Sequence, residues 1–182
     1  MPRDEATPPP AEAAFRGVMG RFATGVTVMT TRAGGVPHGM TANAVSSVSL
    51  EPRLVLVCVE RDTEMAPLVA EAGVFALSIL GADQDAVSNR FADSSRAEGE
   101  AQFADLAVEA AVTGAPVLAD ALAWLDCRVW ATYDGGDHVI VVGEVLALAP
   151  DEDATDDGAA ADASASPGPL IYYRSAYRTL AS

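Results

Sequence analysis

Two long apolar runs joined by a tight turn constrain the fold of this chain more than any other feature. Residues 121–133 and 138–148 are rich in β-branched and aromatic side chains, and Asp134-Gly135-Gly136-Asp137 joins them. Glycine supplies the positive φ that a tight hairpin needs, so we expect the two strands to pair antiparallel. The other strand-like runs are 26–31, 39–49, 54–59, 74–80 and 170–173. The sequence therefore predicts a mainly β fold, a closed or partly closed antiparallel barrel with a few helices outside.

Residues 38–59 contain two successive strands of different character. Side chains alternate between the faces of a strand, so residues 39–49 are expected to present one small, polar face. That face consists of Thr41, Asn43, Val45, Ser47 and Ser49. Residues 54–59 are uniformly apolar, which is typical of a strand covered on both faces. Such a pair can form the wall of a ligand site, and the pattern fits equally well a strand whose hydroxyls face water.

Three short helices are expected between the strands. Apolar residues recur at helical spacing over 13–22, and a second helix is expected over 65–71, capped by Asp62 or Thr63 and ended by Gly73. A third follows Asp83, its expected cap, and carries Arg90 and Phe91.

The composition favours one domain and excludes several partners. The chain has 182 residues, half of them hydrophobic, which suits a single domain over 13–180 after a disordered lead-in at 1–12. A net charge of −15 argues against binding nucleic acid, and much of it falls in a segment at about 151–167 that we expect to be a mobile acidic loop. We expect no membrane span and no secretory signal, and hence a cytoplasmic protein.

Several catalytic signatures are absent from the sequence. There is no glycine-rich phosphate loop, no Cys-x-x-Cys and no serine in a Gly-x-Ser-x-Gly elbow. The two histidines, His38 and His138, have no metal-ligand spacing with the cysteines. Cys58 and Cys127 lie in apolar runs, where a buried hydrophobic role is expected. Hydrolases and metalloenzymes are therefore disfavoured, and we expect no metal.

Four short segments could nevertheless contact a ligand. They are Ser88, Arg90 and Phe91 at a helix end, Asp137 and His138 at a turn, Tyr173 and Arg174 at the end of the last strand, and Thr24 and Gly25 at the start of the first. An arginine fork suits a phosphate, and a glycine allows close backbone approach. Each segment also has a plainer interpretation. For Phe91, periodicity favours core packing. Exposed positions fit Arg90 and His138 as well as ligand contacts do, and the tyrosines fit core or dimer contacts.

In order along the chain, these segments resemble the flavin reductase domain family, short reductases that supply reduced flavin to two-component monooxygenases. The resemblance rests on Arg21–Val28, Gly39–Asn43, Ser47–Pro52, Arg90–Ala92, Gly136–His138 and Tyr172–Arg174. It implies an FMN-binding split β-barrel, usually a homodimer, that binds FMN or FAD and takes hydride from NADH or NADPH. It also implies a partner monooxygenase that receives the reduced flavin.

The resemblance implies a role for each matched residue. Thr41, Ala42, Asn43 and Ala44 would line the flavin, with Ser47 close by. Cys58, Val59 and Glu60 would contact its isoalloxazine or ribityl chain mainly through backbone atoms. Ser88, Arg90 and Phe91 would hold the phosphate end. Asp137 and His138 would meet the nicotinamide nucleotide, with Tyr173 and Arg174 beside the same opening. The chain departs from the family pattern at Ala44, where many relatives have serine, and in the acidic insert before the last strand.

Hydride transfer mainly requires that the two rings be positioned, so we expect His138 to orient the nicotinamide nucleotide rather than exchange protons. Two other functions fit the same sequence: an enzyme resembling pyridoxamine-phosphate oxidase with permanent FMN, and a flavin carrier without catalysis.

Overall fold

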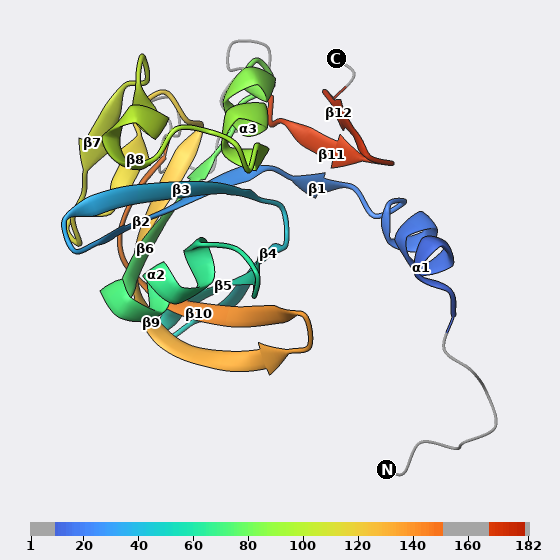
Figure 1. Ribbon diagram of the computed structural model, residues 1–182, viewed down its shortest axis with the longest axis horizontal. Helices are drawn as coiled ribbons and strands as arrows, with labels where there is room; N and C mark the ends of the chain where they lie inside the picture. Colours follow the sequence, from blue (N-terminus) through green and yellow to red (C-terminus); the bar gives the residue numbers. More distant parts are fainter. Residues whose placement is uncertain (1–9, 151–167, 181–182) are drawn as a thin grey trace.

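The computed structural model describes residues 10–150 and 168–180, and its core is a seven-stranded antiparallel sheet (Figure 1). The strand order is β3-β2-β6-β9-β10-β5-β4. The bounds are β2 Thr27–Ala33, β3 Val36–Ala42, β4 Val45–Leu50, β5 Arg53–Glu60, β6 Val74–Ile79, β9 Ala123–Gly135 and β10 His138–Pro150. The predicted mainly β, antiparallel fold is confirmed.

Two smaller antiparallel sheets and four helical segments complete the described chain. One sheet joins β1 (Thr24–Gly25), β11 (Ile171–Tyr173) and β12 (Ala176–Arg178), and the other pairs β7 (Val108–Ala110) with β8 (Pro116–Leu118). The helical segments are α1 (Glu12–Met19), α2 (Met65–Ala72), α3 (Asp85–Ala92) and the 3-10 turn η1 (Gly99–Phe103).

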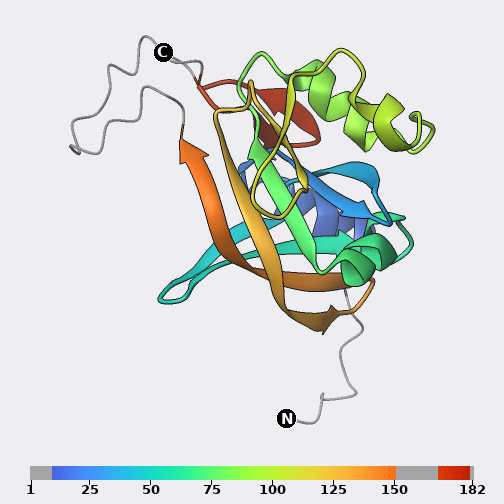
Figure 2. The same ribbon diagram turned by 90° about the vertical axis from the view of Figure 1, so that its left-hand side faces the viewer.

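The hairpin of β9 and β10 is the longest ladder, as the turn chemistry predicts. His138 pairs with Gly135, so Gly136 and Asp137 form a two-residue loop, and Gly136 has φ of +83°. Irregularities at Val142/Gly143 and between Val145 and Ala147 interrupt the ladder. Bulges of this kind bend a strand pair, and Figure 2 shows both strands curving around the body of the sheet.

The segment predicted as one strand over 39–49 is two strands on opposite edges of the sheet. β3 pairs with β2 and β4 pairs with β5, while Asn43 and Ala44 connect them. The prediction of a single alternating face was therefore wrong, because the pairing partners of the two halves lie far apart in the sequence. In the described ranges no ladder joins β3 to β4, so the sheet is open and the closed barrel is not observed.

The strand β5 is buried on one face only. Val55, Val57 and Val59 are at most 4% exposed, whereas Leu54, Leu56 and Cys58 on the other face are half-buried. The prediction that both faces of this strand are covered was wrong within one copy of the chain, because no described residue packs fully over the face of Leu54, Leu56 and Cys58.

The core has two main parts. Between the sheet and α2, Met65 and Val69 pack with the fully buried Phe75, Leu77 and Val57. Around α3 and η1, a second cluster contains Val26, Leu80, Phe91, Phe103 and Leu170. This second cluster joins the β1–β11–β12 sheet to the rest of the molecule.

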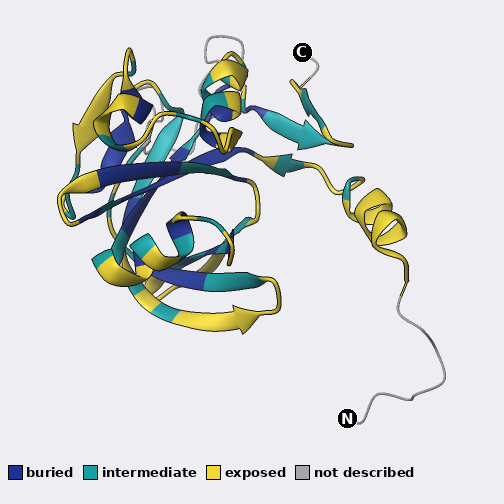
Figure 3. Ribbon diagram, in the orientation of Figure 1, coloured by how far each residue is buried: buried dark blue, intermediate teal, exposed yellow. Residues whose placement is uncertain are grey.

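Helix α1 stands apart from both cores. It has no buried residue, and Phe15, Val18 and Met19 are 51–68% exposed, so its apolar face meets no covering element in the described chain (Figure 3). The periodicity correctly predicted the helix, although it begins at Glu12 and ends at Met19 rather than at Phe22.

Helices α2 and α3 lie where they were predicted, but their N-caps differ. Glu64 and Gln84 occupy the N-cap positions, and neither side chain makes a capping hydrogen bond, so the expected caps Asp62, Thr63 and Asp83 were wrong. Gly73 ends α2 in the left-handed conformation, as expected.

The disordered lead-in at 1–12 and the acidic loop at about 151–167 fall mostly or wholly outside the described residues, so both stay predictions. None of the described helices is long and apolar enough to span a membrane.

Candidate functional site

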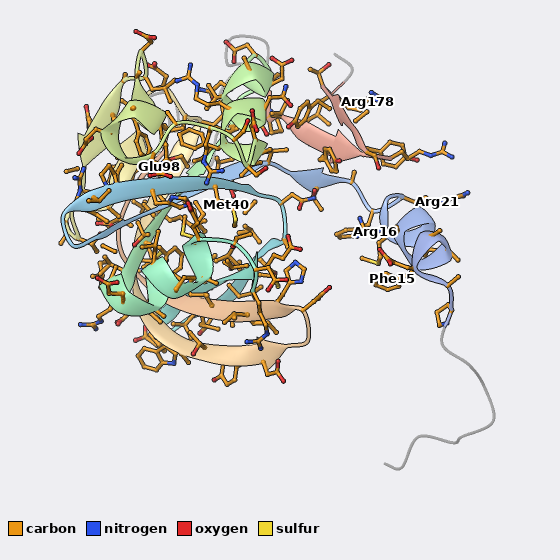
Figure 4. The ribbon with its side chains drawn as sticks, in the orientation of Figure 1. Phe15, Arg16, Arg21, Met40, Glu98 and Arg178 are labelled. Carbon is orange, nitrogen blue, oxygen red and sulfur yellow. The ribbon has the colours of Figure 1, made fainter. Side chains whose placement is uncertain are left out.

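An open groove lies between α1, the Asn43–Ala44 connection, β5 and the turn between β11 and β12. The groove encloses about 550 Å³ and is larger than each of the hollows described below. Phe15, Met19 and Leu56 give it apolar walls, and Arg16 and Arg174 place two cationic side chains along it. Figure 4 shows Phe15 and Arg16 on the side of α1 toward the strands.

Asn43 lies where this groove meets two smaller hollows of about 270 and 200 Å³, because it lines all three. Its side-chain amide donates a hydrogen bond of 3.2 Å to Thr24 Oγ1, which ties β1 to the connection after β3. The Asn43 side chain is exposed, so its carbonyl oxygen is free to accept from a ligand.

The other residues expected along the flavin are distributed unevenly. Thr24, Ala44 and Cys58 line the groove, while Gly25 and Thr41 line the smaller hollows. Ala42 and Val59 are buried in the core, and Ser47 and Glu60 are exposed outside these hollows. No part of Val59 is exposed and Ala42 is 7% exposed, so the flavin contacts expected of both residues stay predictions.

The residues of α3 are held by protein partners rather than directed into the groove. Thr41 Oγ1 donates to the carbonyl oxygen of Ser88 at 2.6 Å, and Ser88 Oγ lies 2.8 Å from the Tyr177 hydroxyl. Arg90 Nη1 donates to the Ala104 carbonyl oxygen at 2.6 Å. The phosphate contact expected of Ser88 and Arg90 thus stays a prediction.

Phe91 is part of the core, as its periodicity indicates. It is fully buried, and its ring centroid lies 5.3 Å from that of Phe103. A Cβ atom at Gly39 would lie 2.5 Å from Phe91 Cε1, so β3 needs glycine there to let the ring approach. Phe91 can support a ligand site only by fixing α3.

The turn between β11 and β12 brings Arg174 to the end of α1. Arg174 and Ser175 have φ of 51° and 60°, the pair of positive values that a type I′ turn requires. The Arg174 amide donates to the Gly20 carbonyl oxygen at 2.8 Å. Tyr173, beside this turn, is half-buried and lines none of the hollows named above.

Asp137 and His138 lie at the tip of the β9–β10 hairpin. His138 Nδ1 donates to Asp137 Oδ1 at 2.8 Å, because a carboxylate can only accept, and Nε2 is left for another partner. This hydrogen bond, with the charge of His138, lowers the pKa of Asp137, and Arg16 acts in the same direction. His138 and Asp137 do not line the groove.

Residues 19–181 match the flavin reductase like domain. The chain belongs to this family. It is 44% identical over 146 residues, 80% of each chain, to an NADH-dependent FAD reductase of Streptomyces globisporus. It is 40% identical over 167 residues to the reductase component of 4-hydroxyphenylacetate 3-monooxygenase of Thermus thermophilus, covering 92% of this chain and 95% of that one.

A solved structure of a flavin reductase component is also similar to this flavin reductase-like chain. BorF, the flavin reductase component of a bacterial two-component tryptophan halogenase, superposes with a TM-score of 0.82 at 38% identity. The match covers 94% of this chain and 99% of BorF.

The groove fits a flavin by its chemistry. Its volume lies within the roughly 300–1,000 Å³ of ordinary ligand sites, and such sites combine apolar walls with a few polar groups. Phe15 and Leu56 offer apolar surface to a ring, Asn43 offers amide groups, and Arg16 and Arg174 offer cations to a phosphate.

Another hollow, of about 330 Å³, lies between β3, α2 and η1 and fits a flavin less well. Its His38 lies 2.9 Å from Arg96 Nη2, and burial together with Arg96 lowers the pKa of His38. Glu64 and Glu98 also line it, so its exposed charges would repel a phosphate. In the described ranges no cluster of three or more His, Cys, Asp or Glu side chains could hold a metal.

Sequence reasoning missed the contribution of α1 and of β12. Phe15, Arg16 and Met19 line the groove, yet no residue of this helix was among the expected site residues. Tyr177, which bonds Ser88, lies in a strand that was not predicted. The usable signal was the four exposed apolar residues of 13–22, which a short helix outside the core could not bury.

The two cysteines provide a test of the groove. Cys58 is half-buried and lines it, whereas Cys127 is fully buried and its pKa is raised to about 12 by burial and by Asp126. We expect iodoacetamide to label Cys58 at neutral pH and to leave Cys127 unmodified, because the thiolate is the reactive form. Mass spectrometry of the peptides gives the extent of labelling. Saturating flavin should slow labelling of Cys58, and equal labelling with and without flavin would place the flavin elsewhere.

Proposed function

We propose that this protein is an NAD(P)H:flavin oxidoreductase that reduces FMN or FAD by hydride transfer and supplies the reduced flavin to a partner monooxygenase. The observation that carries the proposal is the groove beside Asn43, with its apolar walls and two arginine side chains, in a chain of the flavin reductase-like family. The similarity to an NADH-dependent FAD reductase and to a monooxygenase reductase component supports it.

The groove residues would bind and orient the two substrates. Asn43 and the small side chains of Thr24 and Ala44 form the wall against which the ring would lie. Arg174 and the terminal nitrogens of Arg16, whose Nε donates to Glu12, would bind the phosphate. When bound, the flavin supplies the ring that accepts hydride from the nicotinamide. His138 would hold the nicotinamide nucleotide through Nε2, since Nδ1 is already paired with Asp137. No side chain needs to act as nucleophile or strong base.

The exposure of the groove favours a flavin that enters and leaves. Phe15 and Phe22 line it and are 59% and 70% exposed, so the described chain does not enclose a ligand there.

We further propose that two copies of the chain form a homodimer of FMN-binding split barrels. The exposed apolar face of α1 and the half-buried face of β5 lie on the same groove, and a second copy could cover both. The cytoplasmic location remains a prediction from the sequence.

The test is an absorbance assay of NADH and NADPH oxidation by desalted protein with added FMN or FAD. We expect oxidation that depends on added flavin in at least one of the four combinations. Flavin binding without oxidation of either nucleotide would favour the carrier, and full activity without added flavin would favour a permanent cofactor. Either outcome contradicts the proposal.

A further inference from the structure

Arg61 braces the turn that carries Asp137 and His138. It follows β5 directly, and its guanidinium donates from Nε to the Gly136 carbonyl oxygen at 2.8 Å and from Nη2 to Asp134 Oδ1 at 2.5 Å. Its backbone amide donates to the Asp137 carbonyl oxygen at 3.0 Å. Three hydrogen bonds from one residue therefore reach three of the four turn residues.

Asp134 completes this arrangement from within the hairpin. The same Oδ1 that accepts from Arg61 also accepts from the Gly136 amide at 3.1 Å. These contacts lower the pKa of Asp134, the Gly136 hydrogen bond most and Arg61 next, so the carboxylate is charged at neutral pH. The guanidinium thus binds the carbonyl oxygen of Gly136, and the carboxylate binds its amide.

The hairpin tip needs such a brace because little else supports it. β6 pairs with β9 only as far as Arg128, so in the described chain β9 beyond Val129 has β10 as its one strand neighbour. On the other side, β10 meets β5 up to the pair of His138 with Glu60, the residue before Arg61. Arg61 extends that contact around the turn.

The contribution of this ion pair to global stability is expected to be small. The side chains of Arg61 and Asp134 are 43% and 82% exposed, and exposed ion pairs contribute about 0–1 kcal/mol. A purely structural role would therefore leave both stability and kinetics nearly unchanged when Arg61 is replaced.

We propose that Arg61 is a positioning residue for the nicotinamide nucleotide: it fixes the 134–137 turn, and through it the direction of His138 Nε2. This inference rests on the proposed function. A planar guanidinium donates in two fixed directions, to Gly136 and to Asp134, and a lysine ammonium at this position would keep the charge but lose that geometry.

The test compares Arg61→Gln, Arg61→Lys and Asp134→Asn with the unaltered protein. For Arg61→Gln we expect the KM for NADH to rise about tenfold, within the roughly hundredfold cost of a misplacement of about 1 Å. The flavin Kd and the melting temperature should stay nearly unchanged. Arg61→Lys and Asp134→Asn should fall between the unaltered protein and Arg61→Gln.

Two controls separate positioning from other effects. Arg128→Gln breaks a similar exposed pair, 2.6 Å from Arg128 Nη2 to Glu144 Oε2, farther along the same hairpin, and should leave the KM unchanged. In a His138→Ala background, Arg61→Gln should add less than about a twofold effect, because residues that act through one another are not additive.

A readout without activity comes from NMR of the imidazole rings. The chain has two histidines, so their signals can be told apart. Arg61→Gln should shift or broaden the His138 signals and leave those of His38 unchanged. Unchanged His138 signals, an unchanged KM, or an equal rise in the His138→Ala background would each overturn the inference. If the unaltered protein oxidises neither nucleotide, the proposed function itself fails, and the inference fails with it.

Discussion

Replacing His138 with alanine is expected to raise the KM for NADH about tenfold to a hundredfold, since a hydrogen bond to a charged group contributes about 1.5–3 kcal/mol. His138 is the residue on the hairpin tip whose Nε2 is left for a ligand once Nδ1 has bonded Asp137. It does not line the groove, so the Kd for flavin should change little. Steady-state kinetics with varied NADH, together with a flavin titration, measure both quantities.

Asn43→Ala is expected to have the opposite pattern of effects on the flavin Kd and on the KM for NADH. Asn43 lines all three hollows and bonds Thr24, so its loss should weaken flavin binding and leave the KM for NADH nearly unchanged at saturating flavin. If His138→Ala instead weakened flavin alone, the hairpin would belong to the flavin site and the assignment of His138 would be wrong.

The features that the sequence predicted well depend on neighbours in the chain. Glycines at 135 and 136 specify the hairpin between β9 and β10, and the spacing of Phe15, Val18 and Met19 specifies α1. The order of short motifs identified the family. These signals are local, so they can be read without knowing the fold.

The features that were missed depend on distant pairing. The strand over 39–49 divides because β4 pairs with β5 on the far edge of the sheet, and no residue type at Asn43 or Ala44 announces that change. The turn of Arg174 and Ser175 has no glycine despite its positive φ values, so β12 was not predicted. Arg61 reaches Asp134 across 73 positions, a distance in sequence that no local motif spans.

The burial of the site residues was the least predictable part. Phe91 and Val59 belong to the core, while Leu56 and Cys58 face the groove. Alternation along β5 separates Val59 from Cys58, but it does not tell which face is covered. That depends on the core of α2, β2 and β6, which packs against Val55, Val57 and Val59.

The packing of the hairpin on the core leads to the largest expected effect on stability, for Gly143→Ala. Gly143 lies at an irregularity of β10, and a Cβ atom there would lie 2.4 Å from Phe75 Cζ and 2.9 Å from Cys127 Cβ. Phe75 and Cys127 are fully buried, so neither can move away without disturbing the core. Overpacking of this kind costs about 1–3 kcal/mol, and we expect the upper end because three atoms are displaced.

Thermal unfolding followed by circular dichroism measures this effect. A loss of about 3 kcal/mol in a chain of this size lowers the melting temperature by about 6–12 °C. Gly17→Ala is the matched control, because the new methyl group would meet nothing within 4 Å and lies in α1, where alanine favours the helix. An equal melting temperature for both variants would mean that Phe75 does not pack directly against β10. The fall should be accompanied by weaker NADH use, because β10 begins at His138 and its displacement at Gly143 would be carried along the strand to the hairpin tip.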